Sequence, residues 1–316
     1  MTDVVVVGSI NVDMTSYLAR WPGVGETVTA IDTRIGLGGK GANQAIAAVR
    51  LDSSVALIGA IGSDSFGQDA LNRLRRANVH LIPAPAQTEA TGMAFIDVGP
   101  GGGNIIRLAE GANQTLSPEH IDTNAKTIAK AKILLLQNEV PIETSLRAAE
   151  IARAHDVRVI MDPAPAPVPF WSKDVLQAFD VITPNAHEAH LIFGALPQTL
   201  CEAQRAAEEL RDFGPRGAIV TMGGLGVGWS IGTSRGSMAA PTVPTVDTVA
   251  AGDCFNGALA TFLAQGAETC DAIQRAVYAA ALATTRHGAA EATPTANELH
   301  EFGTTLGSNP LESGRV

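Results

Sequence analysis

One apolar helix near the end of the chain is predicted to begin with small residues and an acid. The segment 247–256 reads DTVAAGDCFN, and Phe255, Leu259 and Phe262 recur at helical spacing. Residues 250–252 have too little side chain to cover the backbone amides at the helix start. Uncovered amides of this kind bind anions, so the segment predicts a phosphate site.

Asp253 stands in the first turn of this predicted helix. A carboxylate beside a bound phosphate can accept a proton from a hydroxyl group that attacks phosphorus, as phosphoryl transfer requires. The alternative is that Asp253 only complements the helix dipole. Because this segment alone favours the alternative, the rest of the chain has to decide.

Further polar and glycine-rich stretches accompany this segment. They are GSINVD at 8–13, GGKGANQ at 38–44, EGAN at 110–113, DPAPA at 162–166 and TPNAHE at 183–188. Taken in this order, the stretches resemble the PfkB family of carbohydrate kinases, in its ribokinase-like group, from about Val4 to about Pro294. Several motifs in family order are a far more specific signal than one alone.

The resemblance implies an ATP-dependent phosphotransferase that phosphorylates D-ribose at its 5-hydroxyl group. In that role Asp253 is the general base, and the amides of Ala250, Ala251, Gly252 and Asp253 form the anion hole. The positions that match sugar ligands are Asn11, Asp13, Gly38 with Gly39, Lys40, Asn43, Glu139 and Asp253. The positions that match the nucleotide site are Asn185, Thr221, Gly223, Gly224, Gly226 and Gly252.

The resemblance also implies two ions. Mg²⁺ would accompany ATP, and Glu188 would order one of its waters rather than ligate it directly. K⁺, as a monovalent activator, would be held mostly through backbone oxygens by Asp247, Val249, Thr284 and Gly288.

Each of these residues also has an ordinary structural interpretation. Asn11 and Asp13 are common turn residues, and Lys40 can be a solvated charge. Asn185 can cap a helix in which Glu188 is exposed. Taken together in family order, however, the residues favour ligand binding.

The apolar runs predict an α/β fold. Strands are expected at 4–7, 55–58, 133–136, 157–161, 181–183 and 218–222, with helical patterns between them. This alternation is typical of a mainly parallel central sheet with helices on both faces. Because ligands bind beyond the carboxyl ends of such strands, the polar residues that follow the runs are expected to converge there.

Two stretches, 9–35 and 91–109, interrupt the alternation, and the second contains a predicted hairpin around the glycines at 99–103. We expect a small β-sheet that projects from the body. The resemblance makes this sheet a lid over the sugar and the contact of a homodimer. Residues 1–306 are expected to form a single domain and 307–316 a loose tail.

The composition excludes several classes of protein. The chain has 316 residues, of which 46% are hydrophobic and 17% charged, which supports a large buried core. A formal net charge of -10 repels nucleic acid. No basic leader or membrane-length apolar run is found, so a cytoplasmic protein without a membrane partner is expected.

Cys201, Cys254 and Cys270 have no metal-ligand spacing and are expected to be reduced thiols. Cys254 follows Asp253 directly, which suggests the hypothesis that alkylating reagents inhibit the protein. His187 and His190 share a predicted helix face but lack a third ligand, and are expected at the surface.

Other functions are compatible with parts of the pattern. The glycines at 36–41 fit a dinucleotide fingerprint, but they lie about thirty residues too far along the chain for one. A sugar-binding regulator would need neither Asp253 nor an anion hole. The nearest alternative is a kinase of 2-deoxyribose, a nucleoside or another sugar on the same fold.

Overall fold

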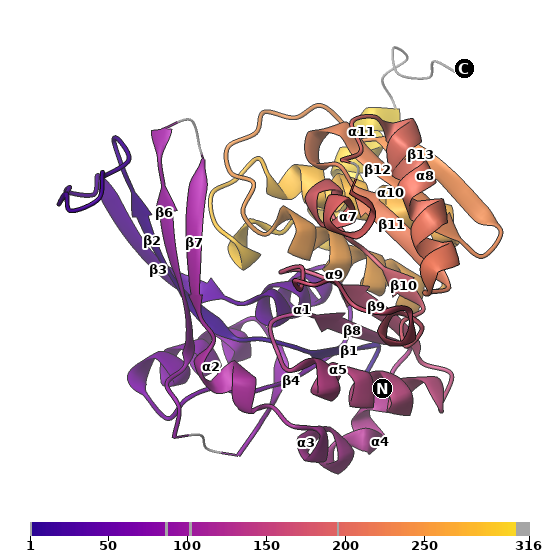
Figure 1. The fold of residues 1–316 in the computed structure, drawn as a ribbon, viewed down its shortest axis with the longest axis horizontal. Coiled ribbons are helices and arrows are strands. Elements are labelled where there is room, and N and C mark those ends of the chain that lie inside the picture. Colours follow the sequence, from indigo (N-terminus) through magenta and orange to yellow (C-terminus); the bar gives the residue numbers. More distant parts are fainter. Residues whose placement is uncertain (1, 86–87, 101–102, 195, 308–316) are drawn as a thin grey trace.

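The strands of the main sheet lie side by side across the body of the molecule (Figure 1). The computed structural model describes residues 2–85, 88–100, 103–194 and 196–307. Within these residues, nine strands form the sheet in the order β13-β12-β11-β10-β9-β8-β1-β4-β5. Their bounds are β1 Val4–Val7, β4 Val55–Gly59, β5 His80–Pro83, β8 Ile133–Gln137, β9 Arg158–Asp162, β10 Val181–Ile182, β11 Gly217–Thr221, β12 Gly226–Ile231 and β13 Ser234–Ala239.

Seven neighbouring strands of this sheet run parallel, in the order β11-β10-β9-β8-β1-β4-β5. The two remaining strands, β12 and β13, are antiparallel to their neighbours. This confirms the predicted α/β class with a mainly parallel sheet. Parallel neighbours bring their carboxyl ends to one edge, so the loops after β1, β8, β9, β10 and β11 meet there.

Helices cover both faces of the main sheet. The helices of one face are α1 Lys40–Arg50, α2 Ser65–Arg76, α9 Ala251–Ala264, α10 Thr269–Ala283 and α11 Ala296–Gly307. Those of the other are α3 Pro118–Thr123, α4 Ala125–Ile128, α5 Ile142–Arg153, α6 Lys173–Leu176, α7 Ala186–Phe193 and α8 Leu200–Phe213. Short 3-10 turns lie at η2 Gly111–Thr115, η3 Gly223–Leu225 and η4 Ala290–Ala292.

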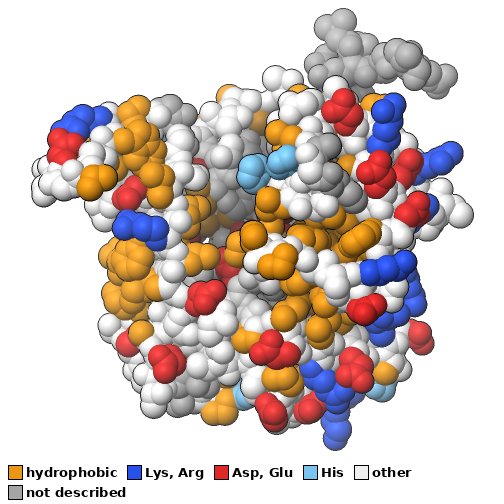
Figure 2. Space-filling view, viewed as in Figure 1, with side chains coloured by type: hydrophobic (Ala, Val, Ile, Leu, Met, Phe, Trp, Pro, Cys, Tyr) orange, Lys and Arg blue, Asp and Glu red, His pale blue; other side chains and the backbone are white. Residues whose placement is uncertain are grey.

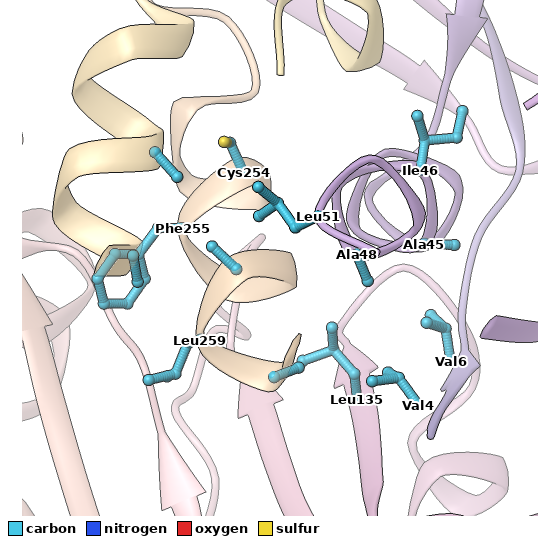
Figure 3. Packing of buried hydrophobic residues seen from close by; sticks show 14 of the residues in the cluster. Val4, Val6, Ala45, Ile46, Ala48, Leu51, Leu135, Cys254, Phe255 and Leu259 are labelled. Atoms are coloured by element: carbon cyan, nitrogen blue, oxygen red, sulfur yellow. The ribbon is translucent and has the colours of Figure 1, made fainter. Parts of the chain in front are cut away.

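The continuous apolar run of β1 shows why the sheet is buried on both sides. Val4 and Val6 pack into the core beneath α1 and α9, whereas Val5 and Val7 pack into the core beneath α5. Successive side chains of a strand point to opposite faces, so only an apolar residue at every position suits a strand between two helical layers. Figure 3 shows Val4 and Val6 against the helices of the first layer.

The lid is a second sheet with the order β3-β2-β6-β7, standing to one side of the body in Figure 1. Its strands are β2 Asn11–Tyr17, β3 Asp32–Gly38, β6 Gly92–Val98 and β7 Asn104–Ala109. The outer pairs are antiparallel, and β2 pairs with β6 in parallel. The sheet was therefore predicted correctly, although β3 continues beyond the expected boundary at residue 35 and ends beside the start of α1.

The strands of the body agree with their predicted bounds within one residue, but β5, β12 and β13 were not predicted. Gly226, Gly228 and Gly236 lie within the β12–β13 hairpin and interrupt its apolar pattern. The residues of its edge strand β13 are alternately partly exposed and fully exposed, so no apolar run marks this strand. The predicted tail at 308–316 lies outside the described residues, and Gly307 is the last residue of α11. No helix in the described ranges has the length and apolar composition needed to cross a bilayer.

Candidate active site

Asp253 lies in the first turn of α9 and is only 5% exposed. Two amide side chains of α1 hold its carboxylate: Asn43 Nδ2 donates to Oδ2 and Gln44 Nε2 to Oδ1, each at 3.0 Å. Ala250, the residue before the helix, has a φ of 57°. A left-handed alanine costs free energy, and strain of this kind is found mainly at functional sites.

The amides at the start of α9 are not all equivalent. The Ala251 amide donates to the Thr248 carbonyl oxygen at 3.3 Å, so it already has an acceptor. Gly252 and Asp253 occupy first-turn positions, for which helix geometry provides no acceptor. The predicted anion hole at 250–253 is therefore best represented by these two amides.

Lys40, the first residue of α1, places its ammonium group between two carboxylates. Its Nζ lies 3.4 Å from Asp162 Oδ2 and 3.6 Å from Asp253 Oδ1. Burial by itself lowers the pKa of Lys40, but Asp162, Asp253 and Glu139 together raise that pKa above its ordinary value. The side chain is therefore a fixed positive charge inside the site and not the solvated lysine of the alternative interpretation.

The backbone beside Lys40 is folded tightly over the start of the lid. Gly39 has a φ of 87°, and a Cβ there would lie 2.7 Å from the amide nitrogen of Asn11. The Lys40 amide donates to Glu139 Oε2 at 3.0 Å, and the Ser9 hydroxyl donates to the same oxygen. Only glycine permits this approach, which brings Glu139, Lys40 and Asn11 together.

Asn11 begins β2 and is 4% exposed. Its Oδ1 accepts a hydrogen bond from Asn113 Nδ2 at 2.7 Å, so the amide group of Asn11 is oriented by Asn113. Burial raises the pKa of Asp13, two residues further along β2, to about 7, and the carboxylates of Glu139 and Asp253 add to the rise. Both side chains are thus part of the buried polar cluster and not turn residues.

Asn43 has one atom without a protein partner. Its Nδ2 is bonded to Asp253, while its buried Oδ1 has no hydrogen-bond partner among the described residues. A buried acceptor that lacks a partner costs free energy, which a ligand hydroxyl group would recover. Of the positions predicted to bind the sugar, Lys40 and Asn43 contact Asp253 directly, and Asn43 leaves one buried acceptor free beside it.

A cavity of about 470 Å³ lies at the start of α9. Every predicted nucleotide position lines it, namely Asn185, Thr221, Gly223, Gly224, Gly226 and Gly252. The Thr221 amide donates to the Pro184 carbonyl oxygen, so the ends of β10 and β11 lie side by side. Gly226 serves the fold as well, since its φ is 122° and a Cβ there would lie 2.0 Å from the Met238 carbonyl oxygen.

Asn185 and Glu188 form the capping box of α7. Asn185 Oδ1 accepts from the amides of His187 and Glu188, and the Asn185 amide donates to Glu188 Oε2 at 2.8 Å. The helix cap of the alternative interpretation is therefore present, but Glu188 is 8% exposed and not at the surface. Burial also raises the pKa of Glu188.

A second cavity, of about 550 Å³, separates the lid from the body and contributes to the hollow visible between them in Figure 2. Asp13 and Ile96 line it from the lid. Thr248 lines both this cavity and the cavity at the start of α9, which contains the positions predicted for the nucleotide and is called the nucleotide cavity below. The two cavities therefore adjoin at the segment that leads into α9. Gly252, the residue before Asp253, lines the cavity at the start of α9.

The residues expected to hold K⁺ are only partly grouped. Asp247, Val249 and Gly288 line the lid cavity, and the Asp247 carboxylate accepts from the Val249 amide at 3.0 Å and the Gly288 amide at 3.3 Å. Thr284 lines the nucleotide cavity instead, and its carbonyl oxygen accepts from the amides of Val246 and Asp247. Three of the four positions thus line one cavity, whereas the Thr284 carbonyl oxygen accepts from backbone amides and its residue lines the other cavity.

The hypothesis that Cys254 makes the site sensitive to alkylation does not agree with its surroundings. The side chain is 2% exposed and packs into the core with Phe255 and Leu51 (Figure 3). Burial raises the pKa of the thiol to about 12. Cys201 and Cys270, by contrast, are exposed free thiols.

His187 is exposed as expected, whereas His190 is partly buried. Within the described ranges no group of three or more His, Cys, Asp or Glu side chains could hold a metal ion. Sequence analysis assigned no role to Gln44, Asp162, Asn113 or Ser9, although each contacts a predicted site residue. Their signal was a polar side chain inside an otherwise apolar or small-residue stretch.

Comparison with known proteins agrees with this geometry. The model of the pfkB family of carbohydrate kinases matches residues 1–296. The chain is 38% identical over 298 residues to the ribokinase of Haemophilus influenzae, with 94% of this chain and 97% of the relative covered. It is 34% identical over 303 residues to the deoxyribokinase of Salmonella typhi, with 95% and 98% covered.

The solved structure of Arabidopsis thaliana ribokinase complexed with ribose and ATP superposes with a TM-score of 0.85 at 28% identity, covering 96% of this chain and 99% of that one. The fold and site thus define a sugar kinase of the ribokinase-like type. The chain belongs to the PfkB family of carbohydrate kinases and is a phosphotransferase with an alcohol group as acceptor.

Proposed function

We propose that this kinase transfers the terminal phosphoryl group of ATP to the 5-hydroxyl group of D-ribose. The observation that carries the proposal is the position of Asp253. Two amide side chains hold it, Lys40 of the polar cluster lies 3.6 Å from it, and the residue before it, Gly252, lines the cavity at the start of α9. An acceptor alcohol bound in the cluster and a phosphate at the start of α9 would meet at this carboxylate.

The polar cluster suits a small polyol. Asn11, Asp13 and Glu139 supply acceptors, and Lys40 and the Asn11 amide supply donors. The unpaired Oδ1 of Asn43 adds one further acceptor beside Asp253. Short side chains held by other residues discriminate between polyols because each unmatched buried hydroxyl group costs roughly 1–3 kcal/mol.

In the transfer step the sugar oxygen forms a bond to the terminal phosphorus, the bond from that phosphorus to the bridging oxygen breaks, and ADP leaves. Asp253 orients the hydroxyl group and accepts its proton as the bond to phosphorus forms. The amides of Gly252 and Asp253 stabilise the charge on the transferring group. Closure of the lid would exclude water from this step.

ATP is expected to lie in the cavity lined by Thr221, Gly223 and Gly224, with its phosphates toward Gly252. Mg²⁺ bound to ATP supplies charge neutralisation for the phosphates. Glu188 is the candidate for contact through water, since its buried carboxylate already shares one oxygen with the α7 cap. K⁺ is proposed at Asp247 with the carbonyl oxygens of Val249 and Gly288.

We further propose that the kinase acts as a homodimer through the lid, because large apolar side chains are exposed there. We also propose that it acts in the cytoplasm. A second candidate substrate is 2-deoxyribose, which is favoured by the 34% identity to a deoxyribokinase. The two sugars differ by a single hydroxyl group.

The substrate is tested by a coupled assay of ADP release with Mg-ATP, with and without K⁺. The panel contains ribose, 2-deoxyribose, fructose, adenosine and pseudouridine. We expect the highest kcat/KM with ribose. A higher kcat/KM with 2-deoxyribose would mean that the kinase reaction is right and that 2-deoxyribose is its substrate. Ribose binding without turnover of any compound would support the sugar-binding regulator.

A further inference from the structure

Asp162 is a second buried carboxylate next to the proposed base. It is the last residue of β9 and is 4% exposed. Gln44 Nε2 donates to Asp162 Oδ2 at 2.9 Å and to Asp253 Oδ1 at 3.0 Å. Lys40 Nζ lies 3.4 Å from the first carboxylate and 3.6 Å from the second. The two acids therefore share one amide group and one ammonium group.

Further hydrogen bonds fix the orientation of the groups that the two carboxylates share. Gln137 Nε2 donates to Gln44 Oε1 at 2.7 Å, which leaves the Nε2 of Gln44 to face both carboxylates. The Ala164 amide donates to Asp162 Oδ1 at 3.3 Å, so the other oxygen of Asp162 is directed at Gln44 and Lys40. Gln44 and Gln137 are fully buried. The buried bond between the two glutamines therefore fixes the orientation of the Gln44 amide between the two carboxylates.

Resting on the proposed role of Asp253, we propose that Asp162 is a positioning residue for phosphoryl transfer. It holds Gln44 and Lys40 in shared positions between the two carboxylates, so that neither Lys40 nor Gln44 can move wholly onto Asp253. The Asp253 carboxylate thus keeps both its orientation and its ability to accept the hydroxyl proton.

Electrostatics supports the placement of the Lys40 ammonium group between the two carboxylates. An ammonium group that paired with Asp253 alone would stabilise the ionised carboxylate and weaken it as a base. The charged groups that act on Asp162 are Lys40 from α1, Asp253 from α9 and Glu188 from α7. Burial raises the pKa of Asp162 to about 7, Lys40 opposes the rise, and Asp253 and Glu188 add to it.

The test is Asp162→Asn, which keeps the size of the side chain and an acceptor oxygen but removes the charge. We expect kcat to fall by roughly 10- to 100-fold while KM for sugar and for ATP changes by less than about threefold. The pH profile of kcat should change as well, because Asp162, whose pKa burial raises to about 7, no longer titrates beside the proposed base. The temperature of unfolding should not fall.

The matched control is Asp180→Asn. Asp180 precedes β10, accepts from the Val159 amide at the opposite end of β9 and pairs with Arg216, so it is a hydrogen-bonded, ion-paired aspartate at the other edge of the sheet. Its substitution should leave kcat and the pH profile unchanged. An unchanged kcat and pH profile in Asp162→Asn, or an equal loss of kcat in both variants, would overturn the inference.

Gln44→Met gives a second route to the same answer if Asp162→Asn folds poorly. It removes the shared amide and should also lower kcat more than KM. In the double variant the losses should be much less than additive, because both substitutions break one arrangement. Full additivity, or a normal kcat for Gln44→Met, would contradict the proposal.

All variants are compared on whichever sugar the unsubstituted enzyme turns over fastest. A failure of ribose in the substrate panel would therefore refute the proposed substrate without affecting this comparison. Equal kcat values for the unsubstituted enzyme and Asp162→Asn on the active sugar would refute the role of Asp162.

Discussion

In the proposed reaction Asp253 has two tasks. It has to hold the attacking hydroxyl group in line with the phosphate, and it has to accept the proton of that group. The hydrogen bonds from Asn43 and Gln44 fix both oxygens of the side chain. The residue is therefore suited to orient a hydroxyl group throughout the reaction and to accept the proton only when the bond to phosphorus has begun to form.

The first prediction concerns this residue. Asp253→Asn keeps the shape of the side chain but removes the proton acceptor, so kcat should fall by roughly 10²- to 10⁴-fold, while the Kd for sugar changes by less than about threefold. Steady-state kinetics and calorimetric sugar binding measure both. The control is Asp271→Asn, an exposed acid in the first turn of α10. Near-normal turnover of Asp253→Asn would remove the residue from the mechanism.

The second prediction concerns the three thiols. Because Cys254 is buried and its pKa is raised to about 12, iodoacetamide at pH 8 should modify Cys201 and Cys270 and leave Cys254 unmodified. Mass spectrometry of the intact protein should show two additions, and a third only after denaturation. Activity should survive the double modification. Rapid modification of Cys254 with loss of activity would restore the hypothesis of a sensitive thiol.

At the scale of elements, α9 both packs against α1 and contributes to the proposed site. Gly257 lies at the packing contact and Gly252 at the proposed site. A Cβ at Gly252 would have no heavy atom within 4 Å, since the position opens into the nucleotide cavity. A Cβ at Gly257, one and a half turns further on, would lie 2.6 Å from Ala47 Cβ of α1. The same substitution should therefore have opposite consequences at the two positions.

The third prediction follows from this contrast. Gly252→Ala should leave stability unchanged or raise it by up to about 1 kcal/mol, because alanine is the better helix former. It should raise the KM for ATP by about 10-fold, because the methyl group occupies space expected for phosphate. Gly257→Ala should cost roughly 1–3 kcal/mol through overpacking against α1. Chemical denaturation and steady-state kinetics measure these effects, and a destabilised Gly252→Ala with a normal KM would reverse the assignment.

At the scale of the whole molecule, the lid offers two faces of different character. Asp13 and Ile96 face the cavity above the site. Ile35, Met14 and Phe95 lie next to one another across three strands on the opposite face, and Ile105 of β7 belongs to it as well. Ile35 is 53%, Phe95 39% and Ile105 52% exposed. An apolar face of this kind on a small sheet is suited to a second subunit.

The fourth prediction is that this face holds the homodimer together. Phe95→Asp removes the aromatic ring that lies beside Met14 and opposite Arg107 and puts a charge in its place, so it should shift the protein from dimer to monomer, as measured by light scattering after size-exclusion chromatography. Phe213→Asp, an exposed phenylalanine of α8 far along the chain from the lid strands, is the matched control. A monomeric unsubstituted protein, or a Phe95→Asp dimer, would contradict the proposal.

The sequence by itself predicted the α/β class, six strands of the main sheet, the small second sheet and the family, and it supplied most of the residues proposed for the site. These features depend on local patterns: apolar runs, helical spacing, and glycines beside polar residues. The elements that it missed, β5 and the β12–β13 hairpin, are short or contain glycines, so local propensity carries little signal there. The single domain at 1–306 stays a prediction.

Tertiary structure alone decided how the polar residues share their partners. Gln44 bonds to Asp162, 118 positions away, and to Asp253, 209 positions away, and no periodicity predicts contacts at such separations. The inward direction of Cys254, the burial of Glu188 and the use of the Thr284 carbonyl by backbone amides have the same origin. Each depends on which atoms from distant segments meet when the carboxyl ends of parallel strands and the first turns of α1 and α9 are packed together.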